Sequence, residues 1–167
     1  MAEISVRMGE LATSSDPRTG LVSIGLGSCI GLALVDSSAC VAGLAHVMLP
    51  GPGADAASTR PPGTFADTGV PALLEAVLAA GARRMCLSAV IVGGAQMFGS
   101  AGKMQVGQRN EEAVRLALRS VRIPIVAAET GGGSGRTIRV YLDDIRVTSR
   151  AAGGSEQILL GAMAVAA

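Results

Sequence analysis

Residues 29–49 read CIGLALVDSSACVAGLAHVML, two apolar runs of similar length on either side of the turn-forming segment DSSA. Short apolar runs bounded by turn residues predict buried strands, and two such runs joined by a short turn predict a β-hairpin. Side chains that face each other across adjacent antiparallel strands lie within contact distance. The pattern therefore predicts that Cys29, at the start of the first strand, and His46, near the end of the second, occupy neighbouring positions.

Further strands and two helices surround this hairpin. Alternating or mainly apolar segments predict strands at EISVRMGE (3–10), MCLSAVIVGG (85–94), IPIVAAE (123–129), TIRVYLD (137–143) and IRVTS (145–149). Apolar residues at helical spacing from Val70 to Leu78 predict a helix that opens near Thr68 and stops at Gly81. Asn110, followed by two glutamates, is the predicted N-cap of a second helix. Strands with helices to cover them predict an α+β fold or a layered α/β sandwich.

The composition excludes several classes of function. The chain has 167 residues, a net charge of +1 and 2% aromatic residues. It therefore offers neither a basic surface nor stacking rings for nucleic acid. No basic segment precedes an apolar run at the N-terminus, and the apolar stretch ILLGAMAVAA (158–167) is too short to cross a bilayer. Three cysteines without regular spacing indicate free thiols in a reducing compartment. We expect one domain spanning residues 1–167, cytoplasmic, monomeric and not embedded in a membrane.

A glycine-rich stretch, VSIGLGSCIG (22–31), precedes the first strand of the hairpin and admits two interpretations. A dinucleotide-binding loop needs its third glycine where this chain has Ile30, and a phosphate loop needs a Gly-Lys-Ser/Thr ending that is missing. The other interpretation is a tight turn that exposes the sulfur of Cys29 together with backbone N–H groups. The sequence favours this second interpretation and predicts no cofactor. No C-x-x-C pair accompanies the cysteines, so no metal site is predicted either.

His46 is the only histidine in the chain, which makes it the candidate base for a cysteine nucleophile. An imidazole beside a thiol lowers the thiol pKa and increases the thiolate fraction. Ser23, just before the glycines, is the candidate to orient the imidazole. A structural interpretation stays open, because a cysteine in an apolar run is often a small core residue. We interpret Cys40, after the turn, and Cys86, in a predicted buried strand, as structural residues.

Six segments in order resemble one family: LGSCIGLALVD (26–36), GLAHVMLP (43–50), FADTGV (65–70), VGGAQMF (92–98), VGQRN (106–110) and ETGGGSGR (129–136). They resemble the CheD family of chemoreceptor glutamine deamidases. The resemblance implies an α/β/α layered sandwich with mixed or mainly antiparallel sheets, forming a single CheD-like deamidase domain over residues 1–167. It also implies hydrolysis of selected glutamine side chains on chemoreceptor cytoplasmic domains, with glutamate and ammonia as products.

The resemblance implies roles for three residues. The nucleophilic cysteine of the family, which forms a thioester with the substrate, corresponds to Cys29, and its histidine corresponds to His46. A threonine that positions the histidine corresponds to Ser23, which keeps the hydroxyl but lacks the methyl group. Its rotamer is therefore less restrained than that of threonine.

Four further residues are weaker candidates for the same site. Backbone N–H groups near Gly27 and Ser28 are candidates to stabilise an oxyanion, because they flank the proposed nucleophile. Arg109 and Arg136 are candidates for binding substrate or shaping the site. Neither a metal nor a cofactor is expected to take part.

Two other functions remain open at this point. The family resemblance also allows a regulatory binding module, with weak or no catalysis, that binds a CheC-type phosphatase or a receptor. A cysteine amidase or methylesterase acting on the same receptor sites is the third hypothesis, since thioester chemistry permits ester hydrolysis. A Cys29→Ala variant separates a binder from an enzyme, and glutamine and methyl-glutamate peptides compared side by side separate the two hydrolases.

Overall fold

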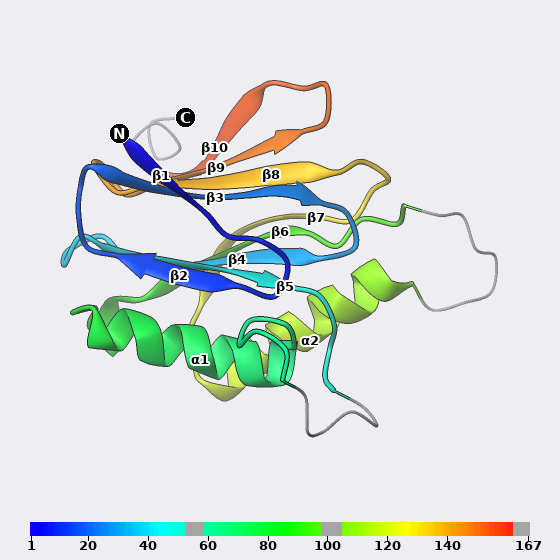
Figure 1. Cartoon of the computed structure of the whole chain (residues 1–167), viewed down its shortest axis with the longest axis horizontal. Helices are drawn as coiled ribbons and strands as arrows, with labels where there is room; N and C mark the ends of the chain where they lie inside the picture. The colour runs from blue at the N-terminus through cyan, green and yellow to red at the C-terminus, as the bar shows by residue number, and fades with distance from the viewer. Residues whose placement is uncertain (53–58, 98–104, 162–167) are drawn as a thin grey trace.

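The computed structural model of the chain describes residues 1–52, 59–97 and 105–161. Over these ranges the strands form two five-stranded sheets (Figure 1). The outer sheet has the order β1 (Ala2–Ser5), β3 (Thr19–Leu26), β8 (Arg136–Tyr141), β9 (Arg146–Ala151) and β10 (Glu156–Leu160). The central sheet has the order β2 (Leu11–Ser14), β5 (Val41–Val47), β4 (Ile30–Asp36), β6 (Ser88–Gly93) and β7 (Ile125–Thr130). The helices are α1 (Ala66–Ala79), the short 3-10 turn η1 (Arg84–Cys86) and α2 (Val106–Ser120).

Most strand pairs are antiparallel. The predicted hairpin is confirmed as β4 paired with β5, and β4 also pairs with β6 on its other side. The two parallel pairs in the described part of the chain are β1 with β3 and β6 with β7. The α+β class, with mixed and mainly antiparallel sheets, is therefore confirmed.

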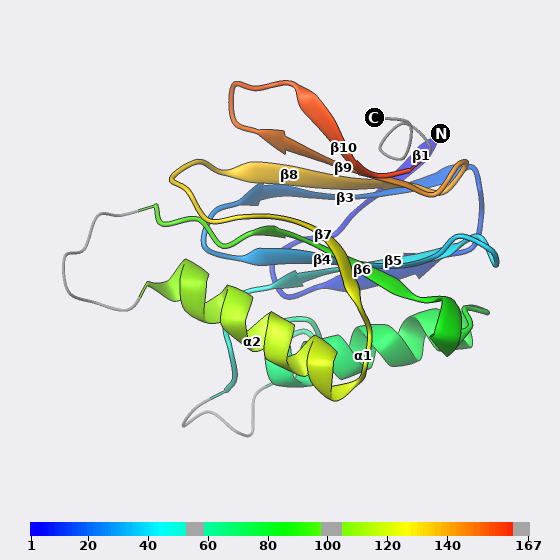
Figure 2. The same ribbon diagram turned by 180° about the vertical axis from the view of Figure 1, so that it is seen from behind.

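The layers differ in order from the expected α/β/α sandwich. Figures 1 and 2 show both long helices under the central sheet and the outer sheet above it, which gives the order sheet, sheet, helices. One apolar cluster joins the central sheet to the helices through residues such as Leu32, Leu73 and Leu118. A second joins the two sheets through residues such as Leu44 and Ile138. Because β4 and β5 are apolar on both faces, they can carry a helix layer on one side and a sheet on the other.

Two local predictions were wrong, and three strands were missed. The second helix begins at Val106, so Asn110 lies inside α2 and is fully buried instead of capping its N-terminus. Cys86 is exposed, because the chain makes the turn η1 before β6 begins at Ser88. Strands β2, β3 and β10 were not predicted; β10 takes up the start of the apolar C-terminal stretch, whose residues 162–167 lie outside the described ranges. No helix within the described ranges is long and apolar enough to cross a membrane.

Candidate active site

The hairpin register places Cys29 and His46 on the same face of the central sheet. His46 pairs with Gly31, and Cys29 lies two residues before Gly31, directly ahead of β4. Side chains two residues apart along a strand share a face, so Cys29 is the diagonal neighbour of His46. That face points into the layer between the sheets, where Cys29 packs half-buried against the inter-sheet cluster. The register on which that prediction depends, with His46 opposite Gly31, is present.

Gly31 leaves room beside the imidazole because it has no side chain. A Cβ built at Gly31 would lie 2.7 Å from Cγ2 of Ile138 and 2.8 Å from Cδ1 of Leu26. The space between Gly31 and the outer sheet is thus filled by apolar side chains from β3 and β8. The absence of a side chain at Gly31 therefore lets the two sheets approach each other closely beside His46.

Ser23 reaches His46 from the other sheet. It lies on β3, fully buried, and its Oγ is 2.7 Å from Nδ1 of His46 and 2.8 Å from the carbonyl oxygen of Val6. A hydroxyl has one proton, and a carbonyl can only accept, so the Ser23 hydroxyl donates to Val6. Nδ1 of His46 must then carry the proton and donate to Ser23. This tautomer leaves Nε2 with a free lone pair, the form in which an imidazole acts as a base.

Burial shifts both reacting groups toward their neutral forms. Burial lowers the pKa of His46, a shift that the Val6 carbonyl and the negative charge of Glu10 partly oppose. Burial raises the pKa of the Cys29 thiol, which is contrary to the lowering expected from an adjacent imidazole. The physical reason is that Nε2 of His46 is buried without a hydrogen-bond partner among the described residues, so no bond to Sγ offsets desolvation. Thiol and imidazole therefore rest as a neutral pair.

The loop that carries Cys29 is fixed through its carbonyl groups. The N–H of Ala95 donates to Gly27 at 2.8 Å, and the N–H of Gly94 donates to Cys29 at 2.9 Å. Gly93 has a φ of +116°, and a Cβ there would lie 2.2 Å from the Cys29 oxygen. The turn at residues 93–95 thus lies directly against the nucleophile loop, and glycine is required where the two backbones meet.

Asn110 is the residue that sequence reasoning missed. Its Nδ2 donates to the carbonyl oxygen of Ser28 at 2.9 Å and to that of Met48 at 2.8 Å. It therefore joins the loop next to Cys29 to the strand end just past His46. The only signal available in the sequence was its place in VGQRN, where it was interpreted as a helix cap.

The two arginine candidates differ in their surroundings. Arg136 donates from Nη1 to Gly131 at 2.7 Å and to Gly93 at 3.3 Å, so it supports the turn that holds the nucleophile loop. Arg109 is exposed on α2, and no side-chain hydrogen bond or ion pair is formed by it within the described ranges. Side-chain hydrogen bonds among the described residues therefore connect Arg136, but not Arg109, to the turn beside Cys29. Gly27 and Ser28 are both half-buried in the nucleophile loop.

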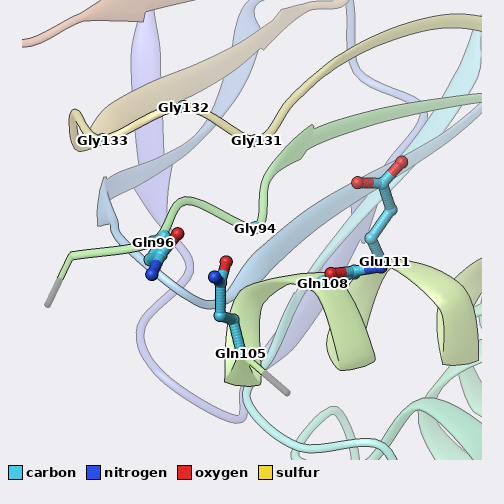
Figure 3. Close-up of a pocket in the computed structure, with 8 residues that line it drawn as sticks. All are labelled: Gly94, Gln96, Gln105, Gln108, Glu111, Gly131, Gly132 and Gly133. Carbon is cyan, nitrogen blue, oxygen red and sulfur yellow. The ribbon is translucent and has the colours of Figure 1, made fainter. Parts of the chain in front are cut away.

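A hollow of about 570 Å³ opens next to this turn (Figure 3). It is lined by the side chains of Gln96, Gln105, Gln108 and Glu111 and by glycine backbone, including Gly94. Its polar lining offers amide donors and acceptors, together with one carboxylate. None of the three proposed reacting residues lines it. Among the described residues, no group of three or more His, Cys, Asp or Glu side chains is placed to hold a metal ion.

Comparison with known proteins identifies the relatives of the chain. The family described as CheD chemotactic sensory transduction matches residues 48–151. A probable chemoreceptor glutamine deamidase CheD of Symbiobacterium thermophilum is 41% identical over 158 residues, covering 93% of this chain and 96% of the relative. The chemoreceptor glutamine deamidase CheD of Halalkalibacterium halodurans is 41% identical over 150 residues, covering 88% of this chain and 92% of that protein.

A solved structure resembles the fold only weakly. A Neisseria meningitidis protein of the DUF152 family superposes with a TM-score of 0.47 at 8% identity, covering 80% of this chain and 64% of that one. A likeness at this level supports no statement about function.

Proposed function

The chain belongs to the CheD family, and we propose that it is a protein-glutamine deamidase acting on chemoreceptors through a thioester on Cys29. One observation carries the assignment of the base. Nδ1 of His46 donates to Ser23, and its Nε2, on the face that also bears Cys29, has a lone pair without a hydrogen-bond partner among the described residues. A nucleophile, a base and a group that orients the base are the parts that covalent amide hydrolysis needs.

Because both groups rest neutral, deprotonation accompanies attack. Nε2 of His46 takes the proton of the Cys29 thiol as Sγ bonds to Cδ of the glutamine side chain, and the amide oxygen becomes an oxyanion. The N–H groups of Ser28 and Cys29, which flank the nucleophile, are the proposed donors to that oxygen. Free enzymes often hold such pairs loosely, and the distance from Sγ to Nε2 shortens when substrate is bound.

The two half-reactions return every group to its starting state. Protonated His46 gives its proton to the amide nitrogen, the C–N bond breaks, and ammonia leaves a thioester on Cys29. Water then attacks the thioester carbon while Nε2 takes a proton from it. The C–S bond breaks, His46 returns the proton to sulfur, and the receptor carries glutamate where it had glutamine. One water is consumed and one ammonia is released.

The proposed deamidase function also implies a protein substrate, a cellular compartment and a regulatory partner. The substrate is the cytoplasmic part of a chemoreceptor, which places the enzyme in the cytoplasm, acting as a monomeric single domain of residues 1–167. A CheC-type phosphatase is the proposed regulatory partner. Residues from both halves of the chain share both sheets, which supports a single domain.

The test is incubation of a receptor cytoplasmic fragment with wild-type protein and with Cys29→Ala, followed by peptide mass spectrometry. Conversion of glutamine to glutamate by the wild type alone is expected. Tight binding of the fragment without conversion by the wild type would favour the binding module instead. Hydrolysis of methyl-glutamate peptides with no turnover of glutamine peptides would favour the methylesterase.

A further inference from the structure

Asn110 lies outside the group of reacting residues, yet it holds one peptide of the nucleophile loop. It is fully buried on α2, and the two N–H bonds of its Nδ2 donate to the carbonyl oxygens of Ser28 and Met48. The reverse orientation of the amide would set Oδ1 against these two oxygens, so the orientation is fixed. Oδ1 has no hydrogen-bond partner among the described residues. The side chain therefore acts as the donor of two hydrogen bonds.

The peptide that Asn110 holds is the one that supplies the N–H of Cys29. The Ser28–Cys29 peptide is trans and planar, so its C=O and N–H point in opposite directions. Fixing the carbonyl of Ser28 on Asn110 therefore fixes the direction of the Cys29 N–H. The peptide before it is fixed in the same way, because Ala95 donates to the carbonyl of Gly27 and so orients the Ser28 N–H.

These two N–H groups are free to bind an oxyanion. Within the described ranges neither Ser28 nor Cys29 donates a backbone hydrogen bond, although the carbonyls of both residues accept one. Without a partner for its carbonyl, the Ser28–Cys29 peptide could turn over by rotation about ψ of Ser28 and φ of Cys29, and its carbonyl would then point where the donor should be. An oxyanion hole contributes only when its donors already point at the developing charge.

The position of Asn110 is itself defined by close packing. α2 begins against the turn at residues 94–95, where a Cβ on Gly107 would lie 2.5 Å from the carbonyl oxygens of Gly94 and Ala95. The same turn donates to Gly27 and Cys29. Helix, turn and nucleophile loop therefore form one connected unit, in which Asn110 supplies the only side-chain donor to the carbonyls of residues 27–29 seen among the described residues.

We infer that Asn110 is a positioning residue that presets the oxyanion hole by holding the Ser28–Cys29 peptide in its active orientation. This inference rests on the proposed deamidase function. It predicts that loss of the Asn110 amide lowers kcat and leaves both KM and the nucleophilicity of Cys29 nearly unchanged. The expected loss is at least about tenfold, approaching the roughly 10²–10³-fold cost of removing an oxyanion donor.

The experiment compares Asn110→Ala and Asn110→Asp with wild type, using a receptor fragment for kcat and KM and iodoacetamide alkylation of Cys29 followed by peptide mass spectrometry. Alkylation by iodoacetamide is a displacement at carbon that forms no oxyanion, so it reports on the thiol alone. Asn110→Asp keeps the shape but replaces the donor with an acceptor, and it serves if the alanine variant does not fold. Val114→Ala, fully buried one turn further along α2, is the matched control for core destabilisation.

A fall in kcat with unchanged KM and unchanged Cys29 alkylation, absent from Val114→Ala, supports the inference. Wild-type kcat in a folded Asn110 variant overturns it. A fall in kcat that follows the melting temperature, with equal loss in Val114→Ala, also overturns it, because Asn110 would then only stabilise the fold. If wild type itself forms no glutamate, the proposed function fails instead.

Discussion

Replacing Ser23 by valine and by threonine isolates the hydroxyl that orients His46. The two replacements have nearly the same shape, and any strain from the added carbon is common to both. Threonine keeps a hydroxyl that can accept from Nδ1 of His46 and donate to the carbonyl of Val6. Valine leaves both of these groups without a partner inside the protein, since Ser23 is 0% and His46 only 3% exposed.

The magnitude follows from the two bonds that valine loses. A buried polar group left without its partner costs about 1–3 kcal/mol, so the two orphaned groups together should cost about 2–6 kcal/mol of stability. His46 can recover part of this by moving its proton to Nε2, but Nε2 is then no longer a base. If the bias toward the active tautomer is worth about 1–3 kcal/mol, kcat/KM falls by about 5- to 150-fold at 1.4 kcal/mol per factor of ten.

The assay measures glutamate formation from a receptor fragment at matched concentrations of folded protein, with thermal unfolding recorded for each variant. Ser23→Thr should retain activity within about threefold of wild type, because its hydroxyl is held in a restricted rotamer. Ser23→Val should lie far below it. Equal activity in the two variants would refute the view that the Ser23 hydroxyl sets the tautomer of His46.

Three further predictions follow from the same geometry. Because the folded pKa of His46 lies below its ordinary value near 6.5, its contribution to stability is complete above about pH 6.5 and is lost as pH falls through the folded pKa. The melting temperature of the wild type should therefore fall more steeply from pH 8 to pH 5 than that of His46→Gln. Parallel curves would contradict this. Since burial raises the pKa of the Cys29 thiol, iodoacetamide should label Cys29 more slowly at pH 8 than exposed Cys86 in the same sample; faster labelling of Cys29 would indicate a preformed thiolate. Gly93→Ala combines a positive φ with a clash against the Cys29 oxygen, whereas Gly25→Ala has a positive φ and open space. Chemical denaturation should show that the free energy of unfolding falls by at least about 2 kcal/mol for Gly93→Ala and by about 1 kcal/mol for Gly25→Ala. Equal losses would show that the contact with the nucleophile loop is unimportant.

The hairpin and its two functional residues could be predicted because their information is local. The apolar runs on either side of DSSA define the strands, and the strand register then places Cys29 diagonal to His46. Ser23 was proposed from its place just before the glycines and again from the family resemblance, but the contact itself was not predictable, because it crosses from one sheet to the other. The spacing of apolar residues along the chain cannot predict that Ser23 and His46 come within hydrogen-bond distance.

The remaining features depend on tertiary contacts. Asn110 followed by two glutamates has the local pattern of a helix cap, but its side chain bonds to residues 82 and 62 positions away. The position of α2 on the same side of the central sheet as α1 depends on which face of β4 and β5 packs against the helices and which packs against the outer sheet. The thiol pKa was predicted in the wrong direction because burial, which no sequence pattern reports, raises it.

The central claim, that Cys29 is the nucleophile, is tested most directly by the rate of glutamate formation from one receptor fragment with wild type and with Cys29→Ala, side by side. Both proteins should bind the fragment and unfold at similar temperatures, since Cys29 is only half-buried. The account predicts glutamate in the wild-type reaction and a loss of several orders of magnitude in the variant. Glutamate formed by Cys29→Ala at the wild-type rate would contradict it.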